Sequence, residues 1–173
     1  MKVSVTILTV GHSNLSIREL LQVLKDHSVA YVVDVRSSPR SYRFPHFNRP
    51  QLEAALAQAS IGYVYMGDRL GGKSSQGDTN KQWKQGKVDS QLVSNLSRSD
   101  TWAEGIQRLV SLVRERAARG ESGCLLCSEA DPNNCHRSLV AFDLREHLPA
   151  LNLQHVTPRR KGPLEVRFQK TLF

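Results

Sequence analysis

The segment at residues 30–35 constrains the fold most strongly. It reads Ala30-Tyr31-Val32-Val33-Asp34-Val35, a nearly continuous apolar run with three valines. Such a run is typical of a strand that is covered on both faces, as in a parallel sheet packed between helices. Four further segments have the composition of strands, and they are residues 3–10, 61–66, 122–127 and 151–156.

Helical patterns alternate with these strands. After Ser13 or Ser16, either of which can cap a helix, apolar residues recur at helical spacing through residues 17–24. Alternation of strands and helices predicts an α/β fold with three layers, a mainly parallel sheet of about five strands with helices on both faces. The further helices are expected at residues 51–59, 101–119 and 135–147.

Length and composition favour one globular domain over residues 1–173. The chain is 39% hydrophobic and 23% charged, which separates it from disordered sequences. It contains no apolar run of the roughly 20 residues that a membrane span needs, so we expect no membrane partner. The apolar start leads into Gly11-His12-Ser13 without a signal-peptide cleavage site, and three clustered cysteines are a poor disulfide framework. We therefore expect a cytoplasmic protein with reduced thiols.

The charge balance is basic and rich in arginine. The net charge is +8, with sixteen Arg and eight Lys, and the tail at residues 157–173 is also basic. One interpretation is solubility with a general attraction to polyanions. The other is that guanidinium groups bind phosphate or carboxylate in two-point contacts. Net charge alone does not separate the two.

Polar and glycine residues follow each strand in turn. Crossover connections in a parallel sheet bring the loops that follow the strands to one edge, where such folds bind ligands. We therefore expect a site there that draws on several loops. The ligand-binding candidates are Ser13, Asp34, Arg36, Arg40, Ser41, Gly71, Gly72 and Arg137, and the catalytic candidates are His12, Cys127, Glu129, Cys135 and His136.

Five ordered motifs at this edge resemble a known family. They are Gly11-His12-Ser13, the segment at 34–41, Leu70-Gly71-Gly72, Cys127-Ser128-Glu129 and Cys135-His136-Arg137. Together they resemble the domain of unknown function 488 (DUF488) over about residues 5–156. The resemblance implies a small α/β protein and supports the choice of residues, but it implies no settled activity. Cys124 and the basic tail are not part of the pattern.

The thiols and imidazoles suggest nucleophilic or acid–base chemistry. Cys135 is expected in the first turn of a helix, where the helix N-terminus lowers the pKa of a thiol. Cys127 ends a strand and can face the same space, while Glu129 can orient an imidazole or act as a base. His12 can serve as an acid or base near neutral pH. For Cys124 in mid-strand, we expect a small buried residue.

A metal site is the alternative for the cysteines. Cys124 and Cys127 are expected on opposite faces of one strand, and adjacent Cys135 and His136 are expected to splay apart. We therefore assign no metal ligands from the sequence and identify no cofactor. A site built from His12, Cys135 or His136 and Glu129 across several loops stays open. Sulfur transfer is a further option, because Asp-Val-Arg after a strand is similar to rhodanese-like sulfurtransferases, although the acidic residues 128–131 lack their glycines.

Three hypotheses follow. In the first, the chain is an enzyme that binds a phosphorylated or nucleotide-like anion at the strand edge, with residues 67–100 closing over the site. In the second, it is a non-catalytic nucleic-acid-binding module that uses the basic surface and the tail. In the third, the polar motifs brace the loops. The basic residues of the tail are Arg159, Arg160, Lys161, Arg167 and Lys170.

Overall fold

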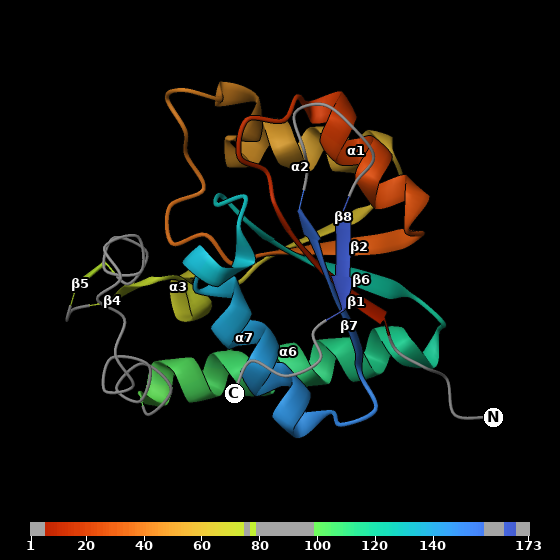
Figure 1. Cartoon of the computed structure of the whole chain (residues 1–173), viewed down its shortest axis with the longest axis vertical. Helices are drawn as coiled ribbons and strands as arrows, with labels where there is room; N and C mark the ends of the chain where they lie inside the picture. The colour runs from red at the N-terminus through yellow and green to blue at the C-terminus, as the bar shows by residue number, and fades with distance from the viewer. Residues whose placement is uncertain (1–5, 75–76, 79–98, 158–164, 169–173) are drawn as a thin grey trace.

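The computed structural model describes residues 6–74, 77–78, 99–157 and 165–168. Its main sheet has six strands in the order β3-β2-β6-β1-β7-β8 (Figure 1). The first five are parallel, and β8 pairs antiparallel with β7 at one edge. These strands are β1 (Thr6–Gly11), β2 (Val29–Asp34), β3 (Gly62–Tyr65), β6 (Ser122–Cys127), β7 (Asn152–Thr157) and β8 (Glu165–Phe168). A separate short pair joins β4 (Lys73–Ser74) to β5 (Gly77–Asp78).

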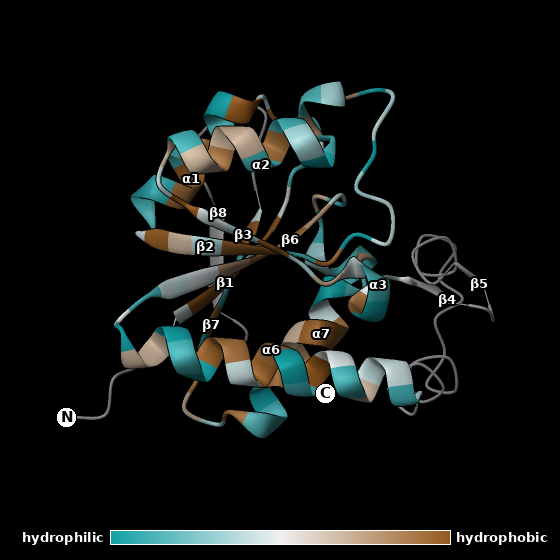
Figure 2. Cartoon of the chain, turned by 180° about the vertical axis from the view of Figure 1, so that it is seen from behind, coloured by the Kyte–Doolittle hydropathy of each residue, from teal (hydrophilic) through white to brown (hydrophobic). Residues whose placement is uncertain are grey.

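Helices cover both faces of the sheet. Figures 1 and 2 show α1 (Ile17–Asp26) and α2 (Arg49–Gln58) on one side, with α6 (Asp100–Ala118) and α7 (Arg137–His147) on the other. The short α3 (Gly67–Leu70) packs against α6. The predicted three-layer α/β fold with a mainly parallel sheet is therefore confirmed.

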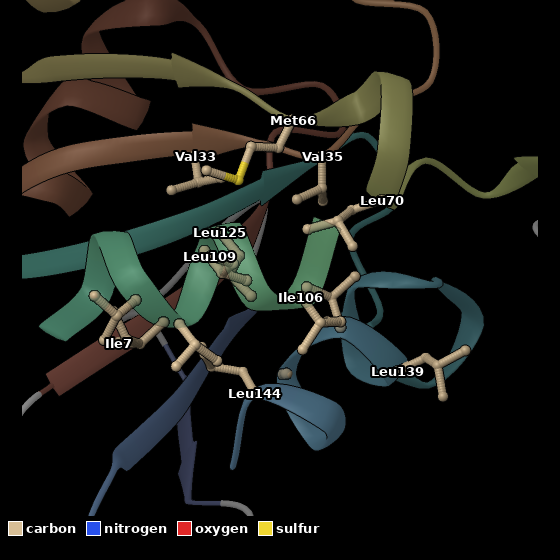
Figure 3. Close-up of a cluster of buried hydrophobic side chains, with 14 of the residues drawn as sticks. Ile7, Val33, Val35, Met66, Leu70, Ile106, Leu109, Leu125, Leu139 and Leu144 are labelled. Carbon is tan, nitrogen blue, oxygen red and sulfur yellow. The ribbon is translucent and has the colours of Figure 1, made fainter. Parts of the chain in front are cut away.

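Each face has its own hydrophobic core. Toward α1 and α2, the sheet packs Leu8, Val32 and Cys124 against helix residues such as Leu20 and Leu52. Toward α6 and α7, the core residues include Ile7, Val33, Leu125, Ile106 and Leu144 (Figure 3). Residues that alternate along β6 thus contribute to opposite cores, because successive side chains of a strand point to opposite faces.

Local signals in the sequence set the ends of the helices. Ser16 caps α1 and forms a capping box with Glu19, as the pattern at this position favours. Ser99 caps α6 by accepting a hydrogen bond from the backbone N–H of Trp102. Gly120 follows the end of α6 with a φ of 73°, a conformation that glycine adopts at little cost.

The starts of two helices and the structure of the tail differ from the sequence predictions. The helix expected from residue 135 begins at Arg137, because a 3-10 turn, η2 (Pro132–Asn134), precedes it and Cys135 is extended (φ −146°, ψ 135°). The helix expected from residue 51 begins at Arg49, where Pro50 in the first turn needs no N–H partner. The tail, which the sequence left unassigned, contributes β8.

None of the helices in the described part of the chain is long and apolar enough to cross a membrane.

Gly11 is required where β1 ends because another backbone passes close to it. A Cβ atom at this position would lie 1.5 Å from the carbonyl oxygen of Glu129. We predict that Gly11→Ala lowers the free energy of unfolding by about 1–3 kcal/mol or more, measured by urea denaturation. Gly62→Ala is the matched control, since its Cβ would meet nothing closer than 3.4 Å. Equal urea midpoints for the two variants would contradict this account.

Candidate functional site

The segments that follow β1, β2 and β6 are held together at the carboxyl edge of the sheet. Backbone hydrogen bonds continue past the strands, from the N–H of His12 to the carbonyl of Cys127 and from the N–H of Ser13 to the carbonyl of Ser128. On the other side of β6, the N–H of Val35 donates to the carbonyl of Leu126. Three of the motif-bearing loops are therefore fixed relative to one another.

This edge is also a topological switch point. The chain leaves β2 through α2 on one face of the sheet and reaches β3, whereas it leaves the neighbouring β6 through α7 on the other face and reaches β7. Because the two connections diverge in opposite directions, the ends of adjacent strands border a crevice. Open α/β sheets bind their ligands at such places.

A buried ion pair lies where β2 ends at this edge of the sheet. The guanidinium of Arg36 contacts the Asp34 carboxylate at two points, Nε to Oδ1 at 2.8 Å and Nη2 to Oδ2 at 2.6 Å. Tyr63 donates its hydroxyl to the same carboxylate at 2.8 Å. Nη1 of Arg36 donates to the carbonyl of Phe47 at 2.9 Å and lies 3.3 Å from Nε2 of His12. Both charged side chains are almost completely buried, so they brace the loop after β2 from within.

His12 is a neutral side chain in this structure near pH 7. It stacks on Phe47, and its Nδ1 lies 3.2 Å from the carbonyl oxygen of Ser13. Since a carbonyl only accepts, Nδ1 carries the proton and Nε2 accepts from Arg36. Burial, aided by the positive charge of Arg36, lowers the pKa of His12 to about 4.

A polar pocket of about 550 Å³ lies at this edge, and His12 is among the residues that line it. Its walls come from the loops that follow β1, β2 and β6, and the side chains of Arg40 and Arg43 are both exposed. The backbone of the loop after β2 is held in place, because the N–H of Ser41 donates to the Oδ1 of Asn48 at 2.6 Å. The lining residues are His12, Ser13, Asn14, Arg40, Ser41, Arg43, Phe44, Ser128 and Glu129.

Arg137 and Gly71 do not line this pocket, and local contacts hold both of them. The fully buried guanidinium of Arg137 donates to the carbonyls of Glu129 and Ala130 and, through Nε, to the hydroxyl of Thr9. Thr9 in turn lies 2.6 Å from Nδ1 of His155. Gly71 packs so closely on Ser37 that a Cβ would approach its Oγ to 2.3 Å, and the neighbouring Gly72 is buried.

Cys127, Cys135 and His136 form a separate buried cluster on the α7 side of the sheet. Nδ1 of His136 lies 3.9 Å from Sγ of Cys127 and 4.0 Å from Sγ of Cys135. The expectation that Cys135 and His136 splay apart is therefore wrong. Because Cys135 precedes α7 in an extended conformation, its side chain turns toward the same point as the imidazole. Cys124 packs in the opposite core, as expected.

The surroundings of the cluster favour ionisation of Cys135 over ionisation of Cys127. Burial opposes ionisation of Cys135, but hydrogen bonds with Cys127 and His136 and the charge of Arg137 outweigh it and hold its pKa well below the usual thiol value. The hydrogen bond of Cys127 with Cys135, together with burial, raises the pKa of Cys127 well above the usual thiol value. Burial disfavours the imidazolium of His136, yet the hydrogen bond with Cys135 and its charge raise the pKa of the imidazole.

The residues selected from the sequence thus fall into three places. Those at the pocket are His12, Ser13, Arg40, Ser41 and Glu129, and those in the thiol cluster are Cys127, Cys135 and His136. The others are buried outside the pocket, and they are Asp34, Arg36, Arg137, Gly71 and Gly72.

Sequence reasoning missed several residues that matter to this edge. Phe47 and Tyr63 complete the environment of the buried ion pair, and the hydroxyl of Thr9 contacts the imidazole on the neighbouring strand. The polar Thr9 within an apolar strand was an available signal, because a buried hydroxyl needs a partner. Nothing in the sequence marks Tyr63 as the partner of Asp34, since their pairing depends on the order of the strands.

Two sequence hypotheses lie mainly outside the described residues. Of the segment 67–100, which was expected to close over the site, residues 75–76 and 79–98 are not described. Of the basic tail residues, only Arg167 lies within a described strand, β8.

The fold and this edge define a doubly wound α/β protein with a switch-point pocket. The family model for the domain of unknown function DUF488 matches residues 16–143, so the chain belongs to that family. Four of the five motifs lie within the matched residues, and Gly11-His12-Ser13 lies just before them. Searches of curated proteins and of solved structures give no significant match.

The lowered pKa of His12 predicts an acid-sensitive fold. An unfolded histidine has a pKa of about 6.5 and takes up a proton that the folded His12 resists until about pH 4. The free energy of unfolding is therefore highest above pH 6.5, and it falls by roughly 3 kcal/mol in total as the pH drops toward 4. His12→Gln should show a shallower loss between pH 7 and 4.5 in urea unfolding. If the free energy of unfolding fell equally with pH in the two proteins, the lowered pKa of His12 would be refuted.

Proposed function

We propose that this protein is an enzyme that acts on a small phosphorylated or otherwise anionic molecule bound in the switch-point pocket. The observation that carries the proposal is that pocket, whose polar walls come from three loops at the carboxyl edge of the sheet. Two exposed guanidinium groups, Arg40 and Arg43, stand at its wall. Guanidinium groups bind phosphate and carboxylate in fixed two-point geometry.

The anion is bound by the exposed arginines rather than by the buried ones. Arg36 already makes a two-point contact with Asp34 and donates to a backbone carbonyl, and Arg137 donates to two carbonyls and a hydroxyl. Releasing either would leave buried partners unsatisfied, which is costly. Ser13 and Ser41 border the pocket beside the exposed arginines and supply hydroxyl donors to the ligand.

Glu129 is the proposed proton-transfer group. It lines the pocket from the loop after β6, and the exposed arginines line it from the loop after β2. His12 also lines the pocket but is not assigned this role, because both of its ring nitrogens already lie within hydrogen-bonding distance of protein groups. A carboxylate within reach of a bound substrate can accept or donate a proton in the transition state.

The binding half of the proposal is tested by thermal unfolding with inorganic phosphate, sulfate, sugar phosphates and nucleotides. An anion at ten times its Kd adds about 1.4 kcal/mol of stability, which is a rise in Tm of about 3–6 °C for a chain of this size. We expect Arg40→Gln combined with Arg43→Gln to abolish the rise. Arg108→Gln on α6, an equally exposed arginine on the far side of the sheet, should retain it.

Two results would contradict the proposal. One is the absence of a Tm rise with every anion tested, and the other is a rise that survives in the double variant. With a ligand in hand, Glu129→Gln should keep the rise in Tm and lower turnover by about 10²–10⁴-fold. Stabilisation by short DNA alone, falling steeply with salt, would favour the nucleic-acid-binding module instead.

A further inference from the structure

The buried cluster of Cys127, Cys135 and His136 has the donor atoms of a metal site. Two sulfurs and one imidazole nitrogen lie within 4.8 Å of one another, and all three side chains are buried. They come from two separate segments, the end of β6 and the turn that leads into α7. None of the three lines the switch-point pocket, so the cluster needs an explanation of its own.

The spacing suits one small ion. Zinc binds sulfur at about 2.3 Å and nitrogen at about 2.0–2.1 Å, so tetrahedral geometry sets S···N at roughly 3.5 Å and S···S at roughly 3.8 Å. The two S···N distances here are 3.9 and 4.0 Å. An ion between the three atoms therefore requires each S···N distance to shorten by about 0.4–0.5 Å.

His136 is oriented as a metal ligand would be. Its Nε2 lies 2.9 Å from the carbonyl oxygen of Val35, and this oxygen can only accept, so Nε2 carries the proton. The lone pair of Nδ1 is then directed to the space between the two sulfurs. Ligating histidines in metalloproteins are fixed in this way by a hydrogen bond from the second ring nitrogen.

We propose that Cys127, Cys135 and His136 bind one divalent transition-metal ion of the zinc class. Two sulfurs and one imidazole select such an ion over magnesium or calcium, which prefer oxygen ligands. On binding, each thiol still protonated releases its proton to solvent, as does Nδ1 of His136 where the imidazole is charged, so the ion is held by two thiolates and a neutral imidazole. The fourth tetrahedral position is left for a water or another small ligand.

Cobalt titration of the whole chain tests the proposal. The protein is purified under reducing conditions, stripped with a chelator and titrated with Co²⁺ under argon. We expect saturation at one equivalent, with the visible d–d bands of tetrahedral Co²⁺ and the near-ultraviolet charge-transfer band of a thiolate ligand. Zn²⁺ should displace the cobalt and bleach both bands, and it should raise the Tm of the chelated protein.

Variants identify the ligands. Cys135→Ser and His136→Gln should lose stoichiometric uptake, whereas Cys124→Ala should keep it. Cys124 is a matched control because it is equally buried on the same strand as Cys127 but packs in the opposite core. Full uptake by Cys135→Ser, or loss of uptake in Cys124→Ala when circular dichroism shows it folded, would overturn the assignment.

The spectrum of the unmodified chain decides the question even if the variants fail to fold. A reduced protein that binds no Co²⁺, or binds it without a sulfur charge-transfer band, contradicts the proposal. Anion binding through Arg40 and Arg43 uses other residues, so the metal site and the proposed function can fail independently.

Discussion

The ion pair between Asp34 and Arg36 is the contact on which the carboxyl edge of the sheet depends. Both charged groups are buried, which is costly unless an opposite charge and hydrogen bonds compensate each of them. The two-point contact joins the opposite charges, the Tyr63 hydroxyl donates to the carboxylate and the Phe47 carbonyl accepts from the guanidinium. In this way one arginine joins the end of β2 to the turn before α2 and to His12 at the end of β1.

The switch point then divides the chemistry of this edge between two sides of β6. On the side of α1 and α2, the loops border an open polar pocket with two exposed guanidinium groups. On the side of α7, the end of β6 and the turn before the helix enclose two sulfurs and an imidazole. The segment just after β2 contributes to both, because the Arg36 side chain reaches His12 and the Val35 carbonyl accepts from His136. Residues adjacent in sequence thus serve two sites with different chemistry.

The fold was largely predictable from the sequence, because alternation of apolar strands and amphipathic helices restricts the topology. The end of β6 at Cys127 and the capping of α1 at Ser16 follow directly from local patterns. The division of the site did not follow, since it depends on the strand order β2-β6-β1 and on buried contacts between distant residues. Local conformation also misled the prediction at Cys135, where a 3-10 turn delays the start of α7 and redirects the thiol. The arginines illustrate the same limit. Arg36 and Arg40 are equally good anion-binding candidates in the sequence, and only the structure shows that Arg36 is buried and Arg40 is exposed.

The most direct measurement is a double-mutant cycle on the buried pair, followed by urea unfolding. Removing one partner leaves an uncompensated buried charge, so Asp34→Asn and Arg36→Met should each cost about 3–5 kcal/mol. The double variant should cost much less than the sum of the two, because no unpaired charge remains. Glu115→Gln removes an exposed pair with Arg119 and should cost at most about 1 kcal/mol. Additive losses, or single losses as small as that of Glu115→Gln, would show that the pair does not hold the edge together.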